Sequence, residues 1–67
     1  MIYMKFIRFN GELVNAGAVS EVVRVKVTDA YAIRLFRTDG SFMTSEVYDT
    51  EADAINRFEE IAKEISR

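Results

Sequence analysis

The chain of 67 residues contains no cysteine, no histidine, no proline and no tryptophan. Without cysteine it has no disulfide framework, no zinc–thiolate site and no thiol nucleophile. Without histidine it lacks the commonest general base and the commonest metal ligand. No apolar run approaches the roughly 20 residues of a membrane-spanning helix, and no secretory signal is recognisable. We therefore expect a cytoplasmic protein with no membrane segment.

The residues that are present give an ordinary globular composition, with 49% hydrophobic and 30% charged residues. A chain of this length predicts one domain that spans residues 1–67. Such a small domain buries only about 60% of the surface that its unfolded chain exposes, so its core is marginal. The formal net charge of −2 argues against a surface built as a whole for nucleic acid.

Turn signals divide the first three quarters of the chain into short strands. Asn10-Gly11 predicts a hairpin with a type I′ turn, because both residues tolerate positive φ. Asp39-Gly40 predicts a second hairpin, whose two-residue turn would set Phe42 beside Arg37. The small residues 16–18 predict a bend or a bulge. The expected strands span about residues 2–9, 12–15, 21–28, 31–37 and 41–48.

Alternation of side chains gives these strands two different faces. Valines alternate with polar residues in one strand, as Val23-Arg24-Val25-Lys26-Val27-Thr28. In the next strand, Ile33 and Leu35 point to one face, and Arg34 and Phe36 point to the other. A slip of one residue in register would exchange the faces, so the pattern does not say which face meets the rest of the molecule.

The last segment has the period of a helix, which we expect over about residues 51–66. Thr50 and Asp53 form a capping box at its start. One stripe of the helix is apolar and should pack on the sheet through Ile55, Phe58, Ile61, Ala62 and Ile65. The opposite side should face water with Arg57, Glu59, Glu60, Lys63 and Glu64.

The predicted fold class is α+β: an antiparallel meander of four to five strands with one C-terminal helix packed on one face. One helix covers only one face of a sheet, yet both faces of these strands carry large apolar residues. An exposed apolar surface of this kind usually marks a partner surface. We therefore expect a non-catalytic interaction module that forms a homodimer or binds another protein.

Binding of single-stranded nucleic acid is the alternative hypothesis. Basic residues are interleaved with aromatic ones in the strands, and bases stack on such surfaces. The residues that would form this site are Tyr3, Lys5, Arg24, Lys26, Arg34 and Phe36. The competing interpretation is that charges on strands keep sheet edges and outer faces soluble.

Catalytic and metal sites are not expected, and neither is a cofactor. Asp49, Glu51, Asp53 and Glu60 come near the spacing of a calcium loop, but that loop needs glycine where Ala54 stands. Acidic residues at this place are typical of the first turn of a helix. Neither Glu46 nor Glu21 has a second acidic residue placed to share a catalytic site with it, and no serine has a recognisable base.

The stretch 14–22, Val-Asn-Ala-Gly-Ala-Val-Ser-Glu-Val, resembles the Ile-Asn-Leu-x-x-Val-x-x-Ile signature of many small bacterial and phage proteins, with Ala16 in place of the usual leucine. The helix start of those proteins is similar to residues 48–52, Tyr-Asp-Thr-Glu-Ala. The resemblance implies a fold of strands followed by one helix and implies no activity. The same order of elements is similar to coactivator-type single-strand DNA binders, which dimerise and bind through their sheets.

Overall fold

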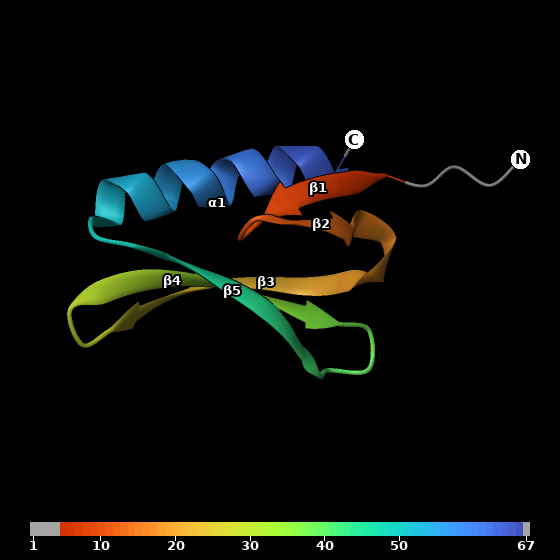
Figure 1. Ribbon diagram of the computed structural model, residues 1–67, viewed down its shortest axis with the longest axis horizontal. Coiled ribbons are helices and arrows are strands. Elements are labelled where there is room, and N and C mark those ends of the chain that lie inside the picture. The colour runs from red at the N-terminus through yellow and green to blue at the C-terminus, as the bar shows by residue number, and fades with distance from the viewer. Residues whose placement is uncertain (1–4, 67) are drawn as a thin grey trace, which may run out of the picture.

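The computed structural model describes residues 5–66, which fold into five antiparallel strands and one C-terminal helix (Figure 1). The α+β fold expected from the sequence is confirmed. The strands form two sheets: a hairpin of β1 and β2, and a three-stranded sheet in the order β3-β4-β5. The element bounds are β1 Phe6–Phe9, β2 Glu12–Asn15, β3 Val19–Val27, β4 Ala30–Arg37, β5 Phe42–Tyr48 and α1 Glu51–Ser66.

The first hairpin has the turn that its sequence predicts. Asn10 and Gly11 have φ angles of 53° and 75°, and they join Phe9 to Glu12, its partner across the hairpin. A side chain at either position costs energy in this conformation, and asparagine and glycine tolerate it best. Described strand structure begins at Phe6; the expected strand residues 2–4 lie outside the described residues.

A short 3-10 helix, η1 (Ala16–Ala18), separates the two sheets where the sequence predicts a bend or a bulge. The Asn15 side-chain oxygen accepts a hydrogen bond of 2.9 Å from the Gly17 amide and so fixes the start of this turn. Because η1 redirects the chain, β3 does not continue the hairpin sheet. The division into two sheets follows from this turn.

The second hairpin differs from its predicted register. Its loop is longer than two residues, since the Arg37 amide donates to the Ser41 carbonyl at 2.8 Å and the Gly40 amide donates to the Arg37 carbonyl at 2.9 Å. Asp39 supports this loop by accepting a hydrogen bond from the Ser41 amide. The prediction that Phe42 pairs with Arg37 is therefore wrong: Phe42 lies opposite Phe36, and a bulge follows.

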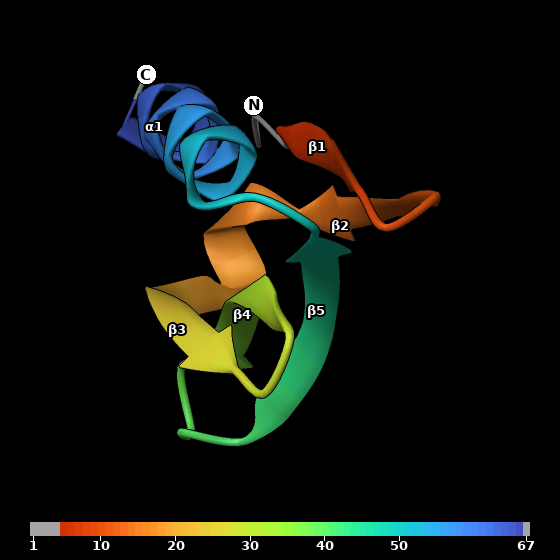
Figure 2. The same ribbon diagram turned by 90° about the vertical axis from the view of Figure 1, so that its left-hand side faces the viewer.

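Helix α1 covers one side of the three-stranded sheet and contacts the β1–β2 hairpin as well (Figures 1 and 2). Its start is capped as predicted, since the Thr50 hydroxyl accepts a hydrogen bond of 3.2 Å from the Asp53 amide. The core between these elements consists of Ile7, Phe9, Val14, Ala16, Ile33, Leu35 and Ile61.

The helix presents a slightly different stripe from the predicted one. Ala54 and Ile61 are fully buried, whereas Ala62, which we expected in the core, is exposed. Arg57 is half-buried rather than turned to water. The buried stripe therefore runs through Ala54, Arg57 and Ile61.

Candidate interaction surface

The side of the three-stranded sheet that faces away from α1 is largely apolar. Antiparallel partners share a face, and Ile33 and Leu35 point into the core, so their strand neighbours point to the opposite side. We call that side the open face, because α1 and the β1–β2 hairpin lie on the other side of the sheet (Figure 2). Its paired residues are Glu21, Val23, Val25, Val27, Ala30, Ala32, Arg34, Phe36, Phe42, Ser45 and Val47.

The valines of β3 lie on the open face, whereas the basic residues of β3 lie on the helix side. Arg24 pairs with the buried Ile33, and Val25 pairs with Ala32 on the opposite side. A strand with one solvated face normally turns its apolar side chains inward and its polar ones outward. Along Val23–Val27 the valines lie on the side opposite α1, where they are half-buried, whereas Arg24 and Lys26 on the helix side are exposed.

Large side chains of the open face remain accessible to solvent. Phe42 is 53% exposed and Val47 is 61% exposed. Phe36 and Phe42 pack edge to face with their ring centroids 6.0 Å apart. With strands about 4.8 Å apart and a rise of about 3.4 Å per residue, this face has a footprint of about 400 Å². The largest apolar patch of a typical monomer covers about 300–600 Å² and is often functional.

The paired residues of the open face include one cation and one anion. Arg34 is half-buried between Val23 on β3 and Ser45 on β5. Glu21 is exposed and pairs with Phe36, which places it diagonally from Arg34. Within residues 5–66 Arg34 forms no ion pair. The open face is thus apolar, formally neutral and carries one charge of each sign.

The residues predicted for nucleic-acid binding do not share one surface. Arg24 and Lys26 lie on the helix side of β3, where Arg24 is 3.7 Å from Glu51 and the Lys26 ammonium lies over the Tyr31 ring. Arg34 and Phe36 lie on the open face. Lys5 donates a hydrogen bond of 2.7 Å to the Glu64 carbonyl near the end of α1. The sixth residue, Tyr3, lies outside the described residues.

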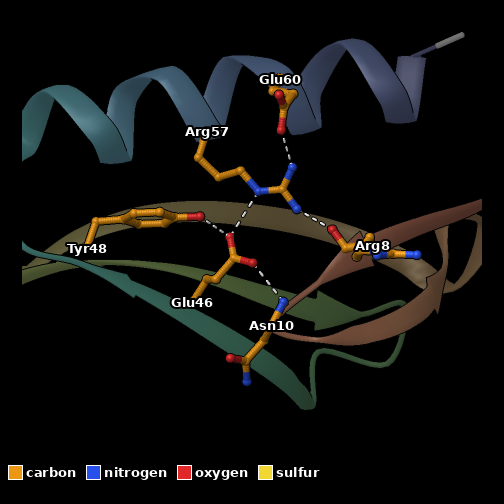
Figure 3. A network of polar contacts seen from close by, with 6 residues as sticks. All are labelled: Arg8, Asn10, Glu46, Tyr48, Arg57 and Glu60. Atoms are coloured by element: carbon orange, nitrogen blue, oxygen red, sulfur yellow. Dashed lines mark hydrogen bonds and ion pairs between the residues drawn. The ribbon is translucent and has the colours of Figure 1, made fainter.

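A polar network joins β5 to the hairpin and the helix on the helix side of the sheet (Figure 3). At its centre, the Glu46 carboxylate accepts hydrogen bonds from the Asn10 amide at 2.7 Å and the Arg57 Nε at 2.9 Å. The Tyr48 hydroxyl donates a third. Glu46, which the sequence gives as an isolated strand carboxylate, is therefore the link between three segments of the chain.

Arg57 completes this network from the helix. Its guanidinium also donates to the Glu60 carboxylate and the Arg8 carbonyl (Figure 3). The guanidinium carbon lies 5.7 Å from the centre of the Phe9 ring. The sequence prediction that Arg57 faces water is wrong. A signal was present: Arg57 stands three residues after Ala54 and four before Ile61, which is the spacing of the buried stripe.

The network shifts the pKa values of its members in directions that favour the observed charges. Burial raises the pKa of the Glu46 carboxyl, but hydrogen bonds from Tyr48, Asn10 and Arg57 outweigh burial and lower it overall. Burial and the bond to Glu46 raise the pKa of Tyr48 to about 12. Because each of these groups is engaged with another, the arrangement holds the fold together, and we assign it a structural role.

Glu46 should make the stability of the fold depend on acid pH. Its pKa is lower in the folded chain than the usual 4.5, so its contribution is present above pH 4.5 and is lost as the pH falls through the folded pKa. Urea unfolding between pH 7 and pH 3 should show that Glu46→Gln loses less stability on acidification than the parent chain. Glu59→Gln, at an exposed helix position, serves as the control and should keep the parent slope. Equal slopes for both variants would contradict the assignment.

Among residues 5–66, acidic side chains form no group arranged to hold a metal ion. No helix in this part of the chain is both long and apolar enough to cross a membrane. A scan against protein-family models, a search of curated proteins and a search of solved structures each found no match to this chain. The functional argument therefore depends on the surface of the molecule itself.

Proposed function

We propose that this chain is a non-catalytic interaction domain that forms a homodimer through its open face. The observation that carries the proposal is the apolar composition of the open face, on which Val23, Val25 and Val27 lie away from α1 and on which Phe42 and Val47 are more than half exposed. Burying apolar area stabilises association by roughly 25 cal/mol per Å² before the costs of association are subtracted. The non-catalytic part is supported by the Glu46 network, whose titratable groups bond to one another.

A second copy of the chain is the partner that the open face suits best. The face is formally neutral, so it offers no net attraction to a strongly acidic or strongly basic partner. Two such faces packed together make a two-sheet core with sheets about 10 Å apart and a helix outside each sheet. A domain of 67 residues gains from this arrangement, because its own core is small.

Binding of single-stranded nucleic acid to the open face is supported less well than binding of a second copy of the chain. Arg34 and Phe36 stand on the open face, but Arg24 and Lys26 point to the other side of the same sheet. Affinity for nucleic acid comes mainly from several cations that follow one backbone path. The open face supplies one cation, which is too few for such a path.

Light scattering on a dilution series of the full chain tests the proposal. Because a footprint of about 400 Å² on each copy, or about 800 Å² in total, is below the roughly 1,200 Å² of stable interfaces, we expect a weak dimer that dissociates in the micromolar range or above. A monomer mass at every concentration up to about 0.5 mM would refute the homodimer. The same samples with a labelled single-stranded oligonucleotide should show no binding. Binding that weakens steeply with salt would instead support the nucleic-acid hypothesis.

The proposal keeps two further expectations from the sequence. A cytoplasmic location fits a chain without cysteine, which has no disulfide to gain from an oxidising compartment. Kinship with the small bacterial and phage proteins that residues 14–22 resemble is supported by the shared order of strands and helix. Fractionation of cells that express the full chain tests the location.

A further inference from the structure

Strand β3 is one border of the three-stranded sheet, because the strand order is β3-β4-β5 (Figure 2). A two-residue turn joins it to β4, and Val27 pairs with Ala30 across that turn. The pair that closes such a turn exchanges both of its backbone hydrogen bonds, and bonded pairs then alternate with non-bonded pairs along the strands. The alternation leaves the backbone N–H and C=O groups of Val22, Arg24 and Lys26 pointing to the outer edge of β3.

This outer edge has no strand beside it in the part of the chain that the structure describes. Within residues 5–66, no hydrogen bond joins the outward backbone groups of Val22, Arg24 or Lys26 to another segment. A row of such groups can bond to one more strand. Protein segments bind to sheets in this way, with affinity from main-chain hydrogen bonds and specificity from the alternate side chains.

The two sides of β3 differ in chemistry. Arg24 and Lys26 are exposed on the helix side, whereas Val23, Val25 and Val27 lie on the open face. Side chains of neighbouring strands meet on the same face and alternate along each strand. An added strand would therefore place every second residue beside the two cations and the residues between them beside the valines.

A second copy of β3 does not suit this edge. When two copies use the whole row from Val22 to Lys26, two-fold symmetry pairs Arg24 with Arg24 of the other copy. Like charges directly opposite each other on neighbouring strands are destabilising. The charges on β3 thus favour a strand of different sequence.

We propose that β3 binds an extended segment of another protein, in which acidic and apolar residues alternate, as a fourth strand of this sheet. The acidic side chains of that segment lie beside Arg24 and Lys26, and its apolar side chains lie beside the valines. Glu51 of α1 stands 3.7 Å from Arg24, so a carboxylate is already accommodated on this side of the strand. The edge is separate from the open face, so this binding does not depend on the homodimer.

Charges on an edge strand also have a purely protective explanation. Lysine in particular keeps other strands away from an unpaired edge. Under that explanation Arg24 and Lys26 prevent aggregation, and the edge accepts no segment of either charge. The test must therefore detect an added strand itself and not only electrostatic attraction.

A blocked heptapeptide of alternating valine and glutamate, Val-Glu-Val-Glu-Val-Glu-Val, is the probe for the full chain. Hydrogen exchange measured by NMR should slow about fivefold or more at the amides of Val22, Arg24 and Lys26 when peptide is added. The Val23 and Val25 amides already bond to β4 and should change less. A peptide of the same composition in the order Val-Val-Glu-Glu-Val-Val-Glu breaks the alternation and should give no such pattern.

Charge reversal tests the side chains of the edge. We expect Lys26→Glu to weaken binding of the alternating peptide at least fivefold, as measured by fluorescence anisotropy of a labelled copy. Lys63→Glu makes the same change at an exposed position of α1 and should bind within about twofold of the parent chain. Circular dichroism confirms that both variants are folded.

Alternate protection along β3, lost in Lys26→Glu and kept in Lys63→Glu, supports the added strand. Absence of protection at about 2 mM peptide overturns it and leaves the protective explanation. Equal binding of the reordered peptide, or equal loss in both variants, also overturns it. A parent chain that is monomeric but shows the protection refutes the homodimer alone.

Discussion

Replacing Ile61 with alanine is expected to destabilise the fold by about 2–5 kcal/mol. Ile61 is 1% exposed and belongs to the core between α1, the hairpin and β4. A domain of this length has a total stability of about 3–10 kcal/mol, so the change removes a large part of it. Urea unfolding followed by circular dichroism measures the loss at one fixed protein concentration, because dimerisation makes stability depend on concentration.

Leu13→Ala provides the matched comparison for this substitution. Leu13 has the same number of side-chain carbons as Ile61 but is 67% exposed on β2. Removing it leaves no cavity, and we expect a change within about 0.5 kcal/mol. If Ile61→Ala unfolded at the same urea concentration as the parent chain, the packing of α1 on the sheet described above would be wrong.

Val47→Asp is expected to weaken the homodimer by about a hundredfold or more. Val47 lies on the open face and is 61% exposed in a single chain, so the monomer tolerates an aspartate there. In the dimer that carboxylate would be covered by an apolar partner surface, and the only cation of the open face near it is Arg34, a diagonal neighbour on β4 of the same chain, so covering it is unfavourable. Light scattering should give the monomer mass at concentrations where the parent chain is a dimer.

Leu13→Asp places the same charge in another exposed strand position, away from the open face. It controls for the poor strand propensity of aspartate and for the added negative charge. We expect it to dimerise like the parent chain. Loss of the dimer in both variants would mean that the added charge or the strand propensity of aspartate breaks it wherever it is placed, whereas loss in neither would remove the open face from the proposal.

Local signals in the sequence were sufficient to predict most elements of this fold. Asn10-Gly11 defines the first hairpin because few other residue pairs adopt two successive positive φ angles. Thr50 and the apolar spacing after it define α1, whose bounds match the predicted range 51–66. In each case neighbouring residues decide the structure, so the pattern is visible without knowledge of the rest of the chain.

The candidate surface could be predicted only in outline. Alternation in β3 separates the valines from Arg24 and Lys26, but which set meets the helix depends on contacts with residues far along the chain. The nucleic-acid hypothesis grouped Arg24 with Arg34, and pairing across β3 and β4 places them on opposite faces. Arg57 was assigned to solvent because its binding partners, Glu46 and the Arg8 carbonyl, come from other elements.

The division of the strands by η1 has a consequence for how the molecule opens. Strands β1 and β2 bond to each other. Side chains of β5 and α1 bond to the backbone of this hairpin, where the Asn10 amide donates to Glu46 and the Arg8 carbonyl accepts from Arg57. The hairpin can therefore detach without breaking a ladder of the β3–β5 sheet. Native-state hydrogen exchange should reveal two cooperative units, with amide protection in β1 and β2 lost at lower denaturant than in β4.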